Sequence, residues 1–281
     1  MVRRPTSPPA IPREPMLLAL ALLGCTDPGP LAVSACEAVP GLSTDAAGMA
    51  LLEPLLIDSS VAILKDATPT RGQEVLGAAG LAQLRAGTTC TADQIDSAGS
   101  GRWAVKLTRT GPSVSADGTI GASVTTPLEW QVADTDGGRV EIGLEKANSM
   151  RKSAQEAAEK GEHRRAASTL RALSKSFADP VLAVDVAHAE AAQDKAEYDK
   201  KLTNAFVAAE DGSVSATFTN SGDRALTDVT VGGDFETPDG PIGADAAIGA
   251  VPAGESVDYK LPIPDGAEGS VKLKTRTFTL L

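Results

Sequence analysis

Residues 103–132 decide the fold of the N-terminal half, because they open with WAVKL at 103–107 and close with LEWQV at 128–132. In both pentapeptides apolar residues alternate with polar or small ones, the period of two that puts one set of side chains on each face of a strand. Residues 120–124 and 140–144 alternate in the same way, with turn signals at Asp117-Gly118 and Asp136-Gly137-Gly138. The sequence therefore predicts an antiparallel meander with one apolar face that needs a cover.

Two apolar helical segments precede the meander and offer that cover. The first spans residues 43–65 and should be kinked or split at Pro54. The second should begin at Thr70, which has capping-box spacing to Gln73. Because these helices provide the nearest apolar surface, we expect residues 43–146 to form an α+β domain.

From Ala147 the composition changes to Ala, Glu, Lys and Arg, and the apolar residues of one segment share one helical stripe: Ala166, Leu170, Leu173 and Phe177. The stretch 161–180 resembles the turn and second helix of a tetratricopeptide repeat, although the preceding helix matches loosely and the terminal proline lies two places late. A single copy cannot form a solenoid. We therefore predict a helical hairpin plus a long helix over 147–202, acting as a spacer or small bundle.

The last segment, 203–281, is rich in Thr, Val, Gly and Asp. Short strand-like runs at 214–219 and 225–231 are separated by an Asn-Ser-Gly turn signal, and the stretch 248–257 contains a Pro-Ala-Gly-Glu turn signal. This order resembles the immunoglobulin-like conserved-repeat and adhesion-related modules of bacterial surface proteins. The resemblance implies a β-sandwich without the cysteine pair and core tryptophan of antibody domains. It implies little about a ligand, because such sandwiches host many functions.

A short apolar stretch near the N-terminus begins at Met16 and closes with the run Leu22-Leu23-Gly24-Cys25. This run resembles the lipobox of bacterial lipoproteins, which implies removal of residues 1–24 as a signal peptide and lipidation of Cys25. The eight apolar residues fall well short of the roughly 20 needed to span a bilayer. Departures from the family are a proline-rich leader and Leu23, where the family prefers a smaller residue. The alternative is an ordinary secretory signal with an unrelated cysteine.

Residues 25–42 are rich in Pro, Gly and small side chains, and we predict a lipidated cysteine followed by a tether. If Cys25 carries lipid, Cys36 and Cys90 remain, and an oxidising envelope favours a disulfide between them. Two free buried thiols are the alternative. His163 and His188 lack metal-ligand spacing with these cysteines, so we interpret both as ordinary surface or packing residues.

The charge balance disfavours nucleic acid as a partner. The formal net charge is −11 and the leader carries +2, so the processed chain would carry −13. With nine aromatic residues, the chain also lacks an obvious platform for stacking bases. One segment departs from this balance, because residues 151–175 hold seven Lys or Arg and three acids. Its possible partner-binding residues are Arg164, Arg165, Arg171 and Lys175, and a merely solvated face is the alternative.

We find no motif for catalysis, a cofactor or a metal, and we therefore predict no catalytic residues, no cofactor and no metal site. The acids Asp234, Glu236 and Asp239 have the composition of a weak calcium site, but a solvated loop is the favoured interpretation. A pair of carboxylates for acid–base chemistry would have to be assembled from distant segments.

The predicted fold is a multidomain α+β protein: an N-terminal α+β domain, a helical hairpin and spacer, and a C-terminal immunoglobulin-like β-sandwich. The leading functional hypothesis is a lipid-anchored, non-enzymatic envelope protein for binding, adhesion or assembly. Its expected partners are the membrane, through lipid on Cys25, and an envelope protein or anionic envelope component. Thr26-Asp27 does not match the retention signal of many inner-membrane lipoproteins, so the outer membrane is preferred in a Gram-negative cell. The alternative is an envelope hydrolase with a carboxylate-based site between the α+β domain and the helices.

Overall fold

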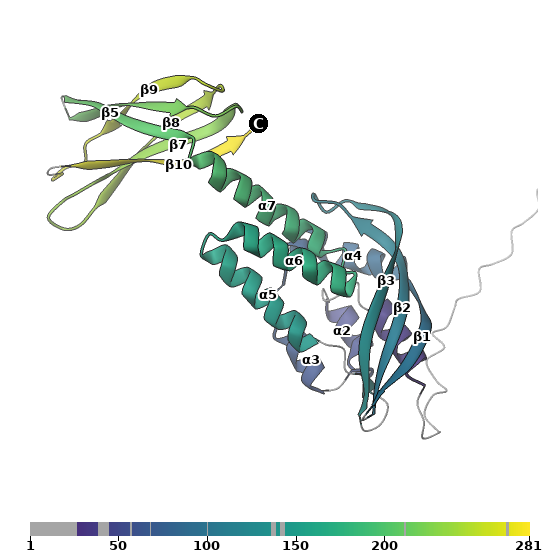
Figure 1. Ribbon diagram of the computed structural model, residues 1–281. Coiled ribbons are helices and arrows are strands. Elements are labelled where there is room, and N and C mark those ends of the chain that lie inside the picture. Colours follow the sequence, from purple (N-terminus) through teal and green to yellow (C-terminus); the bar gives the residue numbers. More distant parts are fainter. Residues whose placement is uncertain are drawn as a thin grey trace, which may run out of the picture.

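The structure, a computed structural model of the chain, describes residues 27–38, 45–56, 58–67, 69–99, 101–135, 139–140, 144–210, 212–267 and 270–281. It is a mixed α/β structure whose helices accompany one four-stranded and two three-stranded antiparallel sheets. Helices surround one face of the four-stranded sheet, and a long helix leads from them to the pair of smaller sheets (Figure 1).

The four-stranded sheet contains the predicted meander in the order β1-β2-β3-β4, with strands β1 (Thr89–Gly99), β2 (Arg102–Val114), β3 (Ile120–Thr135) and β4 (Arg139–Val140). The predicted apolar face is confirmed, because Val105 pairs with Trp130, Leu107 pairs with Leu128, and all four are buried. The runs predicted as two strands at 120–124 and 128–132 form the single strand β3. Leu144 was expected at the end of a strand, but a helix begins there, and residues 141–143 lie outside the described residues.

Within the described residues, the sheet is preceded in sequence by α1 (Pro28–Ala38), α2 (Ala46–Leu52), α3 (Asp58–Lys65) and α4 (Arg71–Ala86). The predicted break near Pro54 separates α2 from α3, and the predicted capping box of Thr70 and Gln73 starts α4. Both predictions are confirmed.

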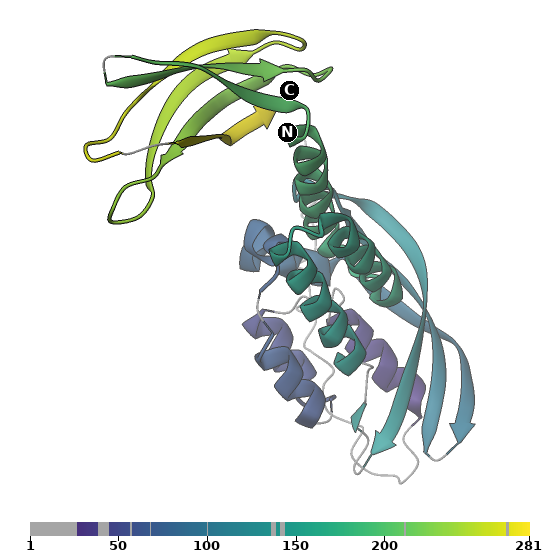
Figure 2. The same ribbon diagram turned by 60° about the vertical axis from the view of Figure 1, so that its left-hand side comes forward.

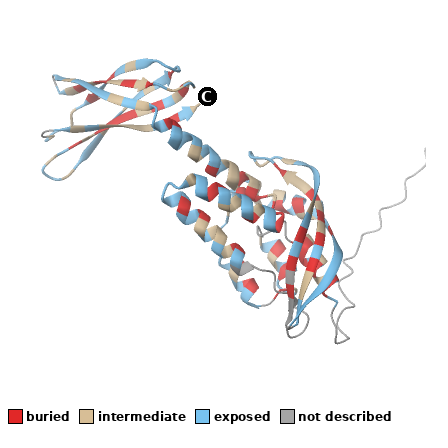
Figure 3. Cartoon of the chain, in the orientation of Figure 1, coloured by how far each residue is buried: buried red, intermediate tan, exposed pale blue. Residues whose placement is uncertain are grey.

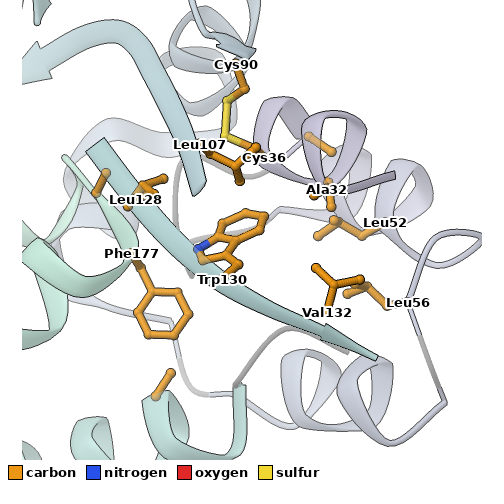
Figure 4. Close-up of a cluster of buried hydrophobic side chains, with 14 of the residues drawn as sticks. Ala32, Cys36, Leu52, Leu56, Cys90, Leu107, Leu128, Trp130, Val132 and Phe177 are labelled. Atoms are coloured by element: carbon orange, nitrogen blue, oxygen red, sulfur yellow. A yellow bond between two sulfur atoms is a disulfide. The ribbon is translucent and has the colours of Figure 1, made fainter. Parts of the chain in front are cut away.

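Helix α1 corrects the tether that we expected over 25–42. The small side chains of Ala32, Ala35 and Cys36 follow helical spacing and are buried in the same core as the sheet. Pro28 is the first residue of the helix, where a missing N–H costs nothing because that group has no helical acceptor. Figure 4 shows this core, with α1 side chains beside Trp130 and Leu107 of the sheet.

The predicted hairpin and long helix are α5 (Leu144–Glu159), α6 (His163–Phe177) and α7 (Leu182–Asp199). Gly161 makes the turn between α5 and α6 with φ 75°, a left-handed conformation that glycine adopts without strain. These helices are more than a spacer, because Leu173, Phe177 and Leu182 belong to the same buried cluster as the sheet. The hairpin therefore supplies part of the cover that we had assigned to residues 43–86.

The remaining strands form two antiparallel sheets, in the orders β5-β6-β9 and β10-β7-β8. They are β5 (Leu202–Glu210), β6 (Ser213–Asn220), β7 (Leu226–Phe235), β8 (Ile242–Val251), β9 (Ser256–Pro262) and β10 (Val271–Leu280). Alternate residues of β6 are buried, among them Val214, Ala216 and Phe218, and they share a core with Val229 and Val231 of β7. The positions between them are of intermediate exposure, and Figure 3 colours the strands of both sheets by this burial.

Candidate functional site

A pocket of about 590 Å³ lies where the start of α4 and the loop before it meet α5, α6 and α7. Its volume is in the range of roughly 300–1,000 Å³ that small-molecule sites occupy. One wall is apolar and consists of Ala154, Ala158, Ala166, Leu170, Ala189 and Ala192. The pocket therefore lies between α4 and the helices α5 to α7. The hydrolase hypothesis requires a site in this region, between the predicted α+β domain and the helices that follow it.

Asp185 on α7 lines the pocket and caps the start of α4. Its carboxylate oxygens accept hydrogen bonds from the backbone N–H of Arg71 at 2.9 Å and of Gly72 at 3.1 Å. Those N–H groups have no acceptor within their own helix, so the carboxylate satisfies two of them and meets the positive end of the helix dipole. Burial raises the pKa of Asp185. The two backbone hydrogen bonds and the positive charge of nearby Arg151 lower it, but they offset only part of the effect of burial.

Arg151 on α5 also lines the pocket and, like Asp185, is half-buried. Burial lowers its pKa, while Asp179 and Asp185 favour its charged form. Asp179 is fully buried, as is Arg109 on β2, which also feels the charge of Asp179 and donates to the Thr88 hydroxyl at 3.1 Å. The two arginines and two aspartates carry equal and opposite charge. Their first role is structural, because removing Asp179 would leave the buried Arg109 without its nearby opposite charge.

His163 and His188, which we interpreted from the sequence as ordinary surface or packing residues, both line this pocket. They come from the start of α6 and the middle of α7, which the hairpin brings together. The spacing of Asp185 and His188, three residues apart on one helix, was the available signal, since such residues share a face. Within the described ranges, no group of three or more His, Cys, Asp or Glu is arranged to hold a metal ion.

The four predicted partner-binding residues, Arg164, Arg165, Arg171 and Lys175, are all exposed on α6. Arg165 pairs with Glu162 at 3.0 Å, and Arg171 pairs with Glu190 of α7. The partners of these two cations therefore lie among the helices and not on the acidic sheets that follow. The basic face is available to a partner, but nothing in its geometry selects one.

Two further predictions concern cysteines. Cys25 lies outside the described residues. Cys36 on α1 and Cys90 on β1 lie at disulfide distance, with their Cα atoms 6.2 Å apart. The Glu37 carboxylate accepts the N–H of Cys90 at 3.1 Å, which adds a second link between α1 and the sheet edge. The structure therefore provides the geometry that the predicted bridge requires.

The acids that we considered for calcium are otherwise engaged where the structure gives their contacts. Asp234 on β7 accepts hydrogen bonds from Lys274 at 2.5 Å and Arg276 at 2.7 Å, both on β10. Arg276 also pairs with Asp245 of β8 at 2.7 Å. These ion pairs connect the three strands of one sheet, and they lower the pKa of Asp234. Asp234 therefore acts in a cross-strand ion network.

Comparisons of the chain with protein-family models, with curated proteins and with solved structures found no match. Over the ranges that the structure describes, the helices are too short or too polar to cross a membrane.

Proposed function

We propose that this chain is a lipid-anchored protein of the bacterial cell envelope that serves as a non-enzymatic module for binding, adhesion or assembly. In this proposal Cys25 carries the lipid, residues 1–24 are the signal peptide, and the two three-stranded sheets form an immunoglobulin-like sandwich. The basic face of Arg164, Arg165, Arg171 and Lys175 is a second contact surface.

The observation that carries the proposal is the course of α7. Its 18 residues correspond to a length of about 27 Å at 1.5 Å per residue. Leu182, at its first turn, is buried in the core of the four-stranded sheet, and Tyr198, at its last turn, is buried in the core of the two smaller sheets. A helix with both ends in packed cores behaves as a strut and not as a flexible linker.

This strut separates the two surfaces that an anchored module needs. Both views place the two smaller sheets at the far end of α7 from the four-stranded sheet (Figure 1 and Figure 2). Helix α1, which packs on the four-stranded sheet, begins at Pro28, three residues after Cys25. A lipid on Cys25 would therefore hold the sheet-and-helix body at the membrane and present the sandwich away from it.

Cys25→Ser tests the anchor, with Thr26→Ser as the matched control for processing near the cleavage point. We expect the unsubstituted chain and the control to fractionate with membranes, to require detergent for release and to carry an acyl modification on Cys25 by mass spectrometry. The Cys25→Ser chain should be released. Retention of that variant on membranes, together with an unmodified Cys25 in the parent chain, would reject the proposal.

An envelope hydrolase is the second candidate, and the pocket is the observation in its favour. A carboxyl group with a raised pKa that shares a pocket with two histidines is a common feature of acid–base sites. Asp185, however, already accepts two backbone hydrogen bonds, so the acids available for chemistry are Asp66 and Glu159 at the rim. Hydrolysis of ester, glycoside or peptide substrates that disappears in Asp66→Asn or Glu159→Gln would favour the enzyme.

A further inference from the structure

We infer that the pocket between α4, α5, α6 and α7 binds an uncharged, largely apolar small molecule. The inference goes beyond the proposed function, since it depends neither on the lipid anchor nor on what the sandwich contacts. It rests on the shape of the pocket, on the apolar wall and on the way its charges are balanced.

The apolar wall is built almost entirely from alanine. Ala154 of α5, Ala166 of α6 and Ala189 of α7 are buried, and Ala158 and Ala192 continue the wall toward solvent. Helices that meet through alanine normally approach closely, but here they leave a cavity of about 590 Å³. An apolar occupant would bury its own surface and the surface of this wall. Burial of apolar surface contributes about 25 cal/mol of favourable free energy per Å².

The charged groups deeper in the pocket wall already have opposite charges nearby within the protein. Asp185 is held by the N–H groups at the start of α4, and Arg151 lies in the field of Asp179 and Asp185. An ionic ligand placed against this wall would lose its hydration without meeting an unbalanced charge. The balance of these half-buried charges therefore disfavours anions and cations alike.

The rim has the same balance. It carries two exposed cations, Arg71 and Lys152, and two exposed anions, Asp66 and Glu159. Equal numbers of opposite charges give no net field that would steer an ion into the pocket. Exposed charges of this kind contribute little to binding, since water screens them.

His163 and His188 supply the polar groups that would orient such a ligand. A neutral imidazole offers one N–H donor and one acceptor nitrogen. A hydroxyl, carbonyl or ether oxygen on an otherwise apolar molecule is the matching group. The proposed ligand class is therefore a neutral molecule with an apolar body and one or two such oxygen atoms.

The experiment measures binding of two fluorescent probes to the purified full-length chain: neutral Nile red and the anion 1-anilinonaphthalene-8-sulfonate. We expect Nile red to bind with a blue-shifted emission and one site per chain, and its Kd to stay nearly constant from about 0.05 M to about 1 M salt, over which ionic contacts are screened. The anionic probe should bind more weakly.

Substitutions that fill the pocket provide the decisive arm. Ala158→Phe on α5 and Ala192→Phe on α7 each place a ring in the cavity, and we expect each to weaken Nile red binding by about tenfold or more as the volume is occupied. The control is Ala172→Phe, because Ala172 is exposed on α6 and does not line the pocket. Circular dichroism establishes that each variant is folded, and the two filling positions lie on different helices in case one variant fails to fold.

A second apolar hollow, of about 370 Å³, lies in the sandwich beside the exposed Phe206, so Phe206→Ser is a further control that should leave the binding unchanged. Three results would overturn the inference. The first is that Ala158→Phe and Ala192→Phe both fold and still bind Nile red as the parent chain does. The second is that Phe206→Ser abolishes Nile red binding. The third is that the anionic probe binds more tightly than Nile red and that its binding weakens with salt. The filling variants and Phe206→Ser all keep the same N-terminus, so differences between them do not depend on the anchor, and failure of the anchor experiment leaves this test interpretable.

Discussion

The Tyr198 hydroxyl oxygen, in the last turn of α7, lies 3.0 Å from Oδ1 of Asn220 at the end of β6. Both residues are almost completely buried. The same hydroxyl accepts the backbone N–H of Arg224 at 2.9 Å, and the Asn220 side-chain amide donates to the carbonyl of Pro252 at 3.0 Å. One pair of side chains thus connects the helix to three separate segments of the two three-stranded sheets, which share one core and are called the sandwich below.

Asn220→Ala should destabilise the sandwich and its attachment to α7. The substitution leaves buried carbonyl groups and the Tyr198 hydroxyl without the Asn220 side chain, and an unsatisfied buried polar group costs about 1–3 kcal/mol. Tyr198→Phe should cost less, since it removes one hydroxyl. Urea unfolding followed by far-ultraviolet circular dichroism gives the free energies.

The matched control is Thr219→Ala, which removes an exposed hydrogen bond to Ser256 on the adjacent strand β9. We expect it to change the free energy of unfolding by about 0.5 kcal/mol or less, the usual range for exposed positions. Equal effects of Asn220→Ala and Thr219→Ala would contradict the structural role given to Asn220.

The bridge between Cys36 and Cys90 should stabilise the N-terminal body. Its sequence separation of 54 residues corresponds to about 4 kcal/mol in the chain-entropy model. The double variant Cys36→Ala with Cys90→Ala should therefore unfold at a lower denaturant concentration than the oxidised chain. Peptide mapping without reductant should recover the linked peptides, and two alkylatable thiols in protein exported to an oxidising compartment would refute the bridge.

The predictable parts of the fold were those that local sequence patterns determine. The alternation at 103–107 and 128–132 identified the buried face of β2 and β3, and the capping box at Thr70 identified the start of α4. Strand β1 has the sequence TCTADQIDSAG, and Cys90 is its one buried residue. The sequence analysis therefore missed this strand. An exposed edge strand has no apolar alternation to detect.

The pocket could not be predicted in the same way. Its lining comes from the loop before α4 and from α5, α6 and α7, and alanine at helical spacing indicates close packing more often than a cavity. Asp185 contacts Arg71 across 114 positions of sequence, a pairing that no local pattern encodes. Helix α1 was mistaken for a tether because Pro28 and Pro30 dominate its first turn, where proline is tolerated.

Asp185 should make the stability of the chain fall as pH rises above its ordinary pKa of 3.8. Because burial raises the pKa of this carboxyl in the folded state, the folded chain binds the proton more tightly than the unfolded chain does. Stability from this group is present at low pH and is lost as pH rises from 3.8 through the raised value. The free energy of unfolding of Asp185→Asn, minus that of the parent chain, should therefore increase over this window.

Asp45 provides a control of opposite sign. Burial raises its pKa, but the hydrogen bonds from Arg85, at 2.6 Å, and from the N–H of Gly48 outweigh burial and lower the pKa below 3.8. Stability from Asp45 is present above 3.8 and is lost as pH falls through the lowered pKa. Denaturant unfolding of Asp45→Asn across acidic pH should show this reversed dependence. The same sign for both variants would argue against the assignment of Asp185.

Replacing Arg164, Arg165, Arg171 and Lys175 together with Gln should leave the sandwich intact. Arg165 and Arg171 pair with Glu162 and Glu190 within the helices, so no link to the sandwich depends on these two pairs. Exposed ion pairs contribute roughly 0–1 kcal/mol each, so the loss of stability should be small. The thermal unfolding of the sandwich should not change.

The same variant should lose affinity for an anionic surface if the basic face is a contact site. The measurement is cosedimentation with phosphatidylglycerol vesicles at increasing salt, since screening weakens exposed charges beyond about 8 Å at physiological ionic strength. The matched control replaces four other exposed lysines, Lys146, Lys200, Lys260 and Lys272, and so carries the same net charge. Loss of binding in the first variant alone would assign the interaction to the face of α6. Equal loss in both would show that overall charge, and not this face, determines binding, and the four residues would then be a solvated surface.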